Sequence, residues 1–318
     1  MKVALAQIAP VLLDREATEA RILDAMSAAK GAHLIVFGEG LLPGYPFWVE
    51  RTDGARFDSA RQKDWYARYL RAAIDIESGG LKSIQERAAS LNLAVYLGIM
   101  ERPQHRGGHS LYASLVYIDA HGEIASVHRK LMPTYEERLV WSPGDGAGLV
   151  AHDLGDFRVG GLNCWENWMP LARAALYAQG VNLHIAVWPG NRVNTEWITR
   201  FIARESRSYV VSVSGLMRRE DLASSSTPDE TWHGDVTLAN GGSCVAAPDG
   251  DWLLEPIVNE SGVFTVDLDL ARVLEERQNF DPSGHYARPD VLALSVNRQR
   301  LAAAQFSDDP VSTDLESG

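Results

Sequence analysis

Cysteine is scarce in this sequence: Cys164 and Cys244 are the only two among 318 residues. Two cysteines so far apart do not make the framework of a small, disulfide-stapled secreted domain. We therefore expect two free thiols and a cytoplasmic protein. The residues around each thiol must then decide between a reactive nucleophile and an inert core side chain.

Long apolar runs are also lacking. None approaches the ~20 residues of a membrane-spanning helix, and residues 1–8 lack the apolar stretch and cleavage site of a signal peptide. Basic residues are in deficit, since 30 Lys and Arg against 42 Asp and Glu give a net charge of −12. This balance argues against nucleic acid or an anionic membrane as a partner, because both favour basic surfaces.

Short apolar segments alternate with amphipathic ones, which predicts an α/β protein with buried sheets. Strands are predicted at residues 3–8, 34–37, 94–99, 111–118, 124–128, 159–163, 183–187 and 210–214, and helices at 15–30, 81–92, 169–179 and 194–209. No linker divides the sequence, so residues 1–292 are expected to form one domain, followed by a tail at 293–318. Flexible segments are expected at residues 218–228 and 307–318.

Three chemically useful side chains each follow a predicted strand: Glu39, Lys130 and Cys164. Loops at the carboxyl ends of strands often build the site in such sheets. A thiol attacks a nitrile or amide carbon when a carboxylate takes its proton, and an ammonium group stabilises the charge that develops. Each signal alone is weak, because such a cysteine is more often a core residue, such a glutamate a turn residue and such a lysine a surface residue.

Three segments together carry a specific resemblance. They are LIVFGEGLLPGYP at residues 34–46 with Glu39, HRKLMPTYEERLVW at 128–141 with Lys130 and Glu137, and GLNCWENWMP at 161–170 with Cys164. In this order and spacing they resemble the nitrilase family of carbon–nitrogen hydrolases, over residues 1–292. The Cys-Trp-Glu-Asn run, with the segments at residues 141–146 and 285–290, is similar to the nitrile-hydrolysing branch of that family.

The resemblance implies an α-β-β-α sandwich that forms a homodimer or a larger homo-oligomer. It implies that Cys164 is the nucleophile, Glu39 the general base, Lys130 the stabilising cation and Glu137 a carboxylate that positions substrate or Lys130. The implied reaction converts a small organic nitrile to its carboxylic acid and ammonia through a thioimidate and a thioester, without metal or other cofactor. Gly38 departs from the family, which often has proline there, and predicts a looser backbone beside the base.

Other side chains in or near these segments are candidates for the substrate pocket. They are Tyr45, Trp165, Asn167 and Trp188, with Trp48 and Trp168 nearby. Each aromatic could as well fill the core or a subunit interface. Alternative functions remain open: an amidase or carbamoylase using the same four residues, nitrile hydratase-like formation of an amide, cyanide hydrolysis, or a non-catalytic binding protein.

The remaining histidines and the second cysteine are given structural roles. His105 and His109 have helical metal-ligand spacing, but the glycine pair between them argues against a helix and no third ligand lies nearby. We therefore predict no metal site there. Cys244, in an apolar Ser-Cys-Val-Ala-Ala strand, is predicted to be a core residue, and His128 to tie a loop in place.

Overall fold

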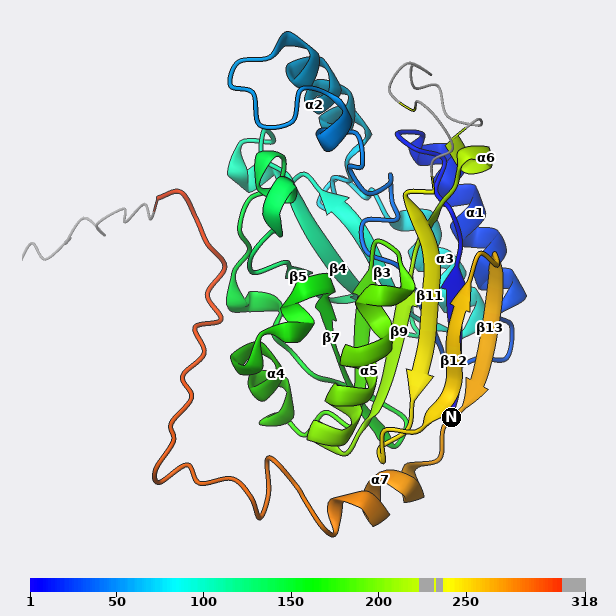
Figure 1. The fold of residues 1–318 in the computed structure, drawn as a ribbon, viewed down its shortest axis with the longest axis vertical. Coiled ribbons are helices and arrows are strands. Elements are labelled where there is room, and N and C mark those ends of the chain that lie inside the picture. The colour runs from blue at the N-terminus through cyan, green and yellow to red at the C-terminus, as the bar shows by residue number, and fades with distance from the viewer. Residues whose placement is uncertain (223–231, 233–236, 305–318) are drawn as a thin grey trace, which may run out of the picture.

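Two β-sheets pack face to face in the computed structural model, which describes residues 1–222, 232 and 237–304 (Figure 1). The first sheet has the strand order β13 (Gly262–Asp267), β1 (Lys2–Gln7), β2 (Leu34–Phe37), β3 (Ala94–Glu101), β4 (Tyr112–Ile118) and β5 (Ile124–Arg129). The second has the order β10 (Leu216–Met217), β11 (Ala239–Ala246), β9 (Tyr209–Ser214), β8 (Leu183–Trp188), β7 (Phe157–Asn163) and β6 (His152–Leu154), and β12 (Trp252–Val258) pairs with β11.

Helices cover the outer faces of the sheets (Figure 1). The first sheet is covered by α1 (Arg15–Ala28) and α3 (Lys82–Leu91), and the second by α4 (Pro170–Tyr177) and α5 (Arg192–Ser206). The other helices are α2 (Ala60–Ala72), α6 (Arg219–Leu222) and α7 (Leu270–Arg277). Short 3₁₀ turns are η1 (Val49–Arg51), η2 (Gln104–Arg106), η3 (Tyr135–Leu139), η4 (Gly146–Gly148) and η5 (Cys164–Trp168).

The central strands β2, β3, β4, β8 and β9 are buried on both faces, because helices cover one side of each sheet and the other sheet covers the second side. In β1, Val3 and Leu5 belong to the cluster between the sheets, whereas Ala4 and Ala6 pack on the side of α1. This period of two, repeated across the strands, gives the α-β-β-α sandwich that the resemblance implied. Among the described residues, no helix combines the length and the apolar character needed to cross a membrane.

The predicted elements match the structure with small shifts at their ends. The helix predicted at residues 194–209 runs from Arg192 to Ser206, because Arg207 adopts a left-handed backbone with φ 51° and β9 starts at Tyr209. The sequence analysis did not predict α2, β6, β10, β12, β13 or α7. The described start of the segment expected to be flexible at 218–228 includes α6, while the rest of it and residues 307–318 lie outside the described residues.

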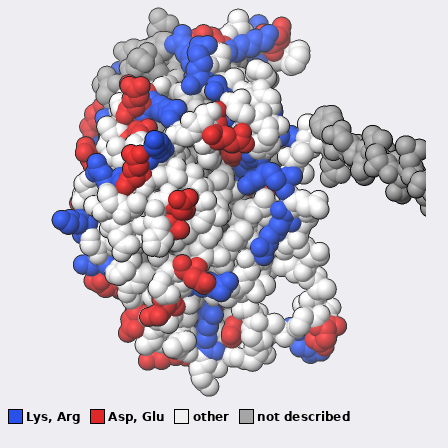
Figure 2. All heavy atoms as spheres, turned by 180° about the vertical axis from the view of Figure 1, so that it is seen from behind, with Lys and Arg blue, Asp and Glu red and all other residues white. Residues whose placement is uncertain are grey.

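The described part of the C-terminal tail follows the body of the protein in an extended course (Figure 1). Arg300 bonds to the Asp145 carboxylate at 3.0 Å and to the Val127 carbonyl at 2.8 Å, and the Leu301 N–H also bonds to Asp145. On the face of the molecule in Figure 2, basic and acidic side chains are interspersed among the described residues. That face therefore carries no continuous surface of one charge sign.

Candidate active site

Glu39 lies two residues beyond the end of β2 and links the two sheets. Its N–H donates to the Trp188 carbonyl at the end of β8, with an N···O distance of 3.1 Å. Its side chain is fully buried, and Oε1 lies 2.8 Å from Lys130 Nζ. Within the described chain, no hydrogen bond to the Glu39 carboxylate accompanies this ionic contact. The carboxylate therefore keeps lone pairs free to accept a proton.

Lys130 directly follows β5, and its ammonium group lies between two carboxylates. Its N–H bonds to the Ala113 carbonyl of β4 at 2.8 Å, which fixes the start of the side chain. Nζ lies 2.8 Å from Glu39 Oε1 and 2.7 Å from Glu137 Oε2. The other oxygen of Glu137 accepts a 2.7 Å hydrogen bond from the Tyr45 hydroxyl. Three charged side chains thus form one buried cluster.

The turn η3 holds Glu137 through a capping box. The Thr134 N–H donates to the Glu137 carboxylate, and the Thr134 side chain accepts from the Glu137 N–H, which also lies 2.9 Å from the Thr134 carbonyl oxygen. The ring of Trp141 lies against the cluster, with Lys130 Nζ 5.4 Å from its centroid. The capping box therefore restricts the position of the Glu137 carboxylate, and the Trp141 ring restricts the position of the Lys130 ammonium.

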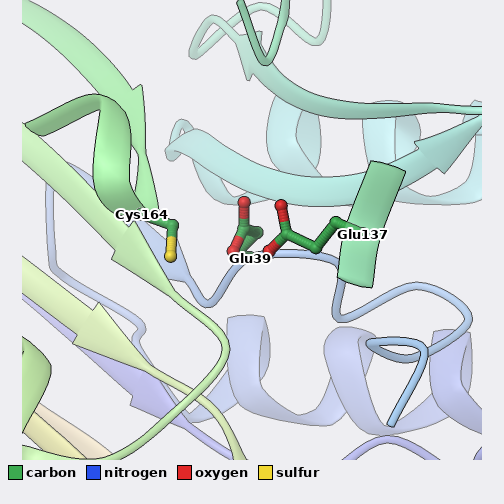
Figure 3. Close-up of side chains that lie close together, drawn as sticks. All are labelled: Glu39, Glu137 and Cys164. Atoms are coloured by element: carbon green, nitrogen blue, oxygen red, sulfur yellow. The ribbon is translucent and has the colours of Figure 1, made fainter. Parts of the chain in front are cut away.

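Cys164 directly follows β7 and begins the turn η5. Its backbone has φ 49°, a left-handed conformation that costs a non-glycine residue energy. The Asn167 Nδ2 donates to the Cys164 carbonyl at 2.9 Å and so supports this conformation. Cys164 Sγ and carboxylate oxygens of Glu39 and Glu137 all lie within 4.8 Å of one another (Figure 3). The second sheet thus delivers a thiol to the carboxylates of the first.

Glu166 joins the loop of the thiol to the loop of the lysine. Its buried carboxylate accepts the Asn163 N–H at 2.8 Å and also the Leu131 N–H, and it lies 3.0 Å from His128 Nε2. Burial acts to raise the pKa of Glu166, but the interactions with His128 and the two backbone N–H groups outweigh burial and lower the pKa. Glu166 is therefore ionised, and His128 ties a loop, as predicted.

The sequence analysis missed this role of Glu166. It used the residue only as part of a family signature. The spacing from Asn163 to Glu166 is that of a capping box at the start of a helical turn, and this local signal could have identified it.

Burial and mutual interaction set the protonation states of the cluster. Burial raises the pKa of Glu39 to about 8, although the nearby Lys130 ammonium acts to lower it. Burial also raises the pKa of the Cys164 thiol well above its usual range, and Lys130 offsets only part of this. For Lys130 burial acts in the opposite direction, but the charges of Cys164, Glu39 and Glu137 outweigh it and raise the pKa. Near neutral pH the cluster holds an ammonium, a neutral thiol and a carboxyl group suited to proton transfer.

Similarity to known proteins supplies the family. Residues 2–278 match the family described as carbon–nitrogen hydrolase. An aliphatic nitrilase from Rhodococcus rhodochrous is 30% identical over 331 aligned residues, which cover 100% of this chain and 84% of the relative. A bifunctional nitrilase/nitrile hydratase from Nicotiana tabacum is 31% identical over 315 aligned residues, which cover 96% of this chain and 89% of the relative. The chain belongs to the carbon–nitrogen hydrolase family.

The backbone of this carbon–nitrogen hydrolase is also similar to solved structures. A carbon–nitrogen hydrolase from Helicobacter pylori G27 matches with a TM-score of 0.67 at 19% identity, over 91% of this chain and 96% of that one. At this identity the likeness concerns the fold alone. It confirms the predicted α/β sandwich.

A pocket of about 400 Å³ opens over the thiol of this carbon–nitrogen hydrolase. Its described lining residues are Tyr45, Pro46, Phe47, Glu50, Thr134, Glu136, Glu137, Cys164, Trp165, Pro189, Gly190, Asn191, Asn194, Thr237 and Leu238. Tyr45 and Trp165, two of the predicted pocket residues, are among them. Trp165 is half exposed, and its ring centroid lies 6.2 Å from that of Trp168. The volume suits a small organic substrate.

Two other predicted pocket residues, Trp188 and Asn167, are not among these described lining residues, and their role toward a substrate stays a prediction. Trp188 is fully buried on the side of α5, in a cluster with Ile198, and serves the site through its carbonyl. Asn167 is also fully buried, and its Oδ1 lies 2.8 Å from His184 Nε2. Trp188 packs in the same buried cluster as Cys164, and the Asn167 amide donates to the Cys164 carbonyl. Trp48 is a core residue stacked on another tryptophan, with ring centroids 5.6 Å apart.

Glu39, Glu137 and Cys164 have a spacing that could also suit a metal ion, and within the described ranges they are the only such group. Here the Lys130 ammonium occupies the position between the carboxylates, at 2.8 and 2.7 Å. A divalent cation in this place would be repelled by the ammonium at close range. We therefore assign the cluster to proton transfer.

The other predicted structural residues are found in the core and at the surface. Cys244 is fully buried, with Sγ 3.6 Å from Thr199 Oγ1, which confirms its assignment to the core. His105 lies in η2 and pairs with the partly exposed Glu77 at 3.0 Å.

Proposed function

We propose that this chain is a nitrilase, which hydrolyses a small organic nitrile to a carboxylic acid and ammonia. The proposal rests on one observation: a thiol and two carboxylates gather around a buried ammonium at the base of a pocket. The relatives described as nitrilases, aligned over almost the whole chain, support a nitrile as substrate.

The first half of the reaction forms a covalent thioimidate. Glu39 takes the thiol proton as Cys164 Sγ attacks the nitrile carbon, and the nitrile nitrogen then receives that proton. Negative charge develops on this nitrogen. The Lys130 ammonium and the Trp165 N–H, which donates toward the Cys164 sulfur, lie beside the reacting atoms and stabilise that charge.

The second half consumes two water molecules. Glu39 removes a proton from the first water, which adds to the thioimidate carbon, and the amine nitrogen takes up a proton and leaves as ammonia. A thioester remains on Cys164. The second water releases the carboxylic acid and restores the thiol, while Glu137 holds the Lys130 ammonium in place. These steps require no metal or other cofactor.

A panel of aliphatic, aromatic and arylacetonitrile substrates, each run beside its amide, tests the proposal. We expect acid and ammonia from at least one class of nitrile and no turnover of the matching amide. The Cys164→Ala variant should be folded but inactive, and Cys244→Ala serves as the control because that thiol lies in the core. Turnover of amides alone would instead indicate an amidase or carbamoylase. Activity of Cys164→Ala near that of the unchanged protein would refute the assigned nucleophile.

An amide product is a second candidate outcome of the same site. If the tetrahedral intermediate expels the thiolate rather than ammonia, the nitrile is only hydrated. The relative described as a bifunctional nitrilase/nitrile hydratase favours this variant. The ratio of amide to acid among the products of the nitrile panel measures how often the nitrile is only hydrated.

We further propose that the chain forms a homodimer or larger homo-oligomer through its α4–α5 face. Large apolar side chains on this face are exposed: Leu171 by 69%, Val193 by 71%, Trp197 by 73% and Phe201 by 50%. Exposed apolar patches of this kind mark protein interfaces. Trp197→Glu should shift sedimentation equilibrium toward monomer, whereas the control Phe57→Ser, on another exposed side chain, should not. A monomeric unchanged protein would overturn the proposal.

We infer a cytoplasmic location, since the proposed chemistry depends on a free Cys164 thiol and a reducing compartment preserves it. Cell fractionation with antibody detection tests this inference. We also infer that residues 1–292 fold as one domain, because the inner cluster draws on both sheets. A single calorimetric unfolding transition is expected, and two separate transitions would contradict it.

A further inference from the structure

The pocket wall carries more negative charge than the proposed chemistry uses. Glu50 and Glu136 line the pocket in addition to Glu137, and the described lining contains no lysine or arginine. Glu50 belongs to η1 and Glu136 to η3, turns that contact each other although they are far apart in sequence. The chain thus brings two further carboxylates to the wall of one cavity.

Neither of these two carboxylates has an ion-pair partner among the described residues. Glu50 is exposed, whereas Glu136 is half buried and its carboxylate accepts a hydrogen bond from its own backbone N–H. Burial, followed by the charges of Glu50 and Glu137, raises the pKa of Glu136, which places the negative charges within range of one another. The cation at the base of the pocket, Lys130, is already paired with two carboxylates.

The shape and chemistry of the wall suit a cationic group. Tyr45, Phe47 and Trp165 also line the cavity, and aromatic faces attract ammonium groups. The Cys164 sulfur fixes where the nitrile carbon must lie. A substrate attacked there occupies the cavity that Glu50 and Glu136 also line.

We propose that Glu50 and Glu136 make the enzyme select its substrates by charge. The pocket would then prefer nitriles that bear a protonated amine and disfavour nitriles that bear a carboxylate. This specificity rests on the proposed nitrilase function. An ammonium about 7 Å from one carboxylate gains roughly threefold to fiftyfold in binding, depending on the local dielectric constant between water and a protein surface. A nitrile that bears a carboxylate binds more weakly by a similar factor. Added salt weakens both effects, because part of the site is exposed to solvent.

Three nitriles of equal chain length test the proposal: one ending in an amine, one in a hydroxyl and one in a carboxylate. We expect kcat/KM at pH 7 to fall at least tenfold at each step in that order. Glu50→Gln and Glu136→Gln should each lower the amine-to-hydroxyl ratio about threefold or more, and the double variant should lower it further. Glu275→Gln, on exposed α7, is the matched control and should leave the ratio unchanged. An equal kcat/KM for the three nitriles, or a ratio unchanged in the double variant, would overturn the specificity.

Labelling of Cys164 provides a readout that does not depend on nitrile turnover. A cationic and an anionic methanethiosulfonate reagent of similar size are compared, and peptide mass spectrometry locates the modified thiol. We expect the cationic reagent to modify Cys164 at least tenfold faster, and the double variant to reduce this preference. If no nitrile reacts but the charge preference appears, the nitrilase function fails while the role of the two glutamates stands. If nitriles react without charge preference in either assay, the specificity fails alone.

Discussion

Glu166→Gln is the substitution that most directly tests how the site is held together. The carboxylate accepts N–H groups from Asn163 and Leu131, which belong to the loops of Cys164 and Lys130 respectively. Glutamine has the same shape but only one acceptor oxygen. One of the two N–H groups must therefore face the amide NH₂, a donor that cannot accept its hydrogen bond.

The cost follows from these contacts. Losing one hydrogen bond to a charged acceptor costs about 1.5–3 kcal/mol, and leaving a buried N–H without a partner costs about 1–3 kcal/mol. We expect the free energy of unfolding to fall by about 3–5 kcal/mol. Urea denaturation measures it, and Glu276→Gln is the control, because its ion pair with Arg207 is partly exposed and contributes less than about 1 kcal/mol.

Catalysis should respond separately from stability. Under conditions where the variant stays folded, kcat should drop about a hundredfold and KM should change much less. The reason is that the two loops no longer hold the Cys164 thiol and the Lys130 ammonium at the positions that the reaction requires. A purely structural residue would not produce this split. A loss of stability below 1 kcal/mol together with kcat within twofold of the unchanged protein would refute the proposed role of Glu166.

Three further predictions concern protonation and hydrogen bonding. Because the ionised form of Glu39 is the base and its pKa is raised to about 8, kcat/KM should rise with pH through about 8; a profile flat from pH 6 to 9 would argue against this base. Because the pKa of Glu166 is lower in the folded protein than the value of about 4.5 in the unfolded chain, its ionised form stabilises the fold above about pH 4.5, and this stabilisation is lost as the pH falls through the folded-state pKa. Glu166→Gln should therefore flatten the acid side of a curve of unfolding free energy against pH, measured with urea. Tyr45→Phe leaves Glu137 Oε1 without its buried donor and should lower kcat about tenfold, whereas Tyr66→Phe, whose hydroxyl bonds at the surface, should leave steady-state kinetics unchanged.

The candidate cluster could be predicted from the sequence because three segments together resemble one family, whereas the position of each residue at a strand end was a weak signal alone. Glu39 and Lys130 follow strands β2 and β5 of the first sheet, and Cys164 follows strand β7 of the second, so the cluster forms where strand ends of two packed sheets meet. The pocket wall could not be predicted in the same way. In β8 the side chains alternate, so that Val187 faces the other sheet and Trp188 faces α5. Proximity in sequence to the motif did not reveal this direction.

Glu50 and Glu136 show a second limit of sequence analysis. They meet because two short turns, η1 and η3, contact each other in the fold, and neither turn has a periodic pattern that would predict the contact. Glu136 adjoins Glu137 in the sequence, yet the two carboxylates have different surroundings. Glu137 is enclosed by hydrogen bonds, whereas Glu136 faces the cavity. Specificity therefore depends on tertiary contacts that local sequence does not record.

The backbone beside Glu39 explains why catalysis and fold stability should be coupled in this protein. Gly38 was expected to loosen this segment, but a Cβ at Gly38 would lie 3.0 Å from the Gly215 nitrogen and 3.1 Å from the Trp188 carbonyl oxygen. A side chain here would require its neighbours to give by a few tenths of an ångström, and the close approach brings the Glu39 N–H within bonding distance of the second sheet. The base belongs to one sheet and the nucleophile to the other. A side chain at Gly38 would press on this contact between the sheets at the point where the thiol proton must be transferred, so we expect Gly38→Pro to change kcat even where the protein still folds. A kcat equal to that of the unchanged protein would show that the neighbouring backbone adjusts freely.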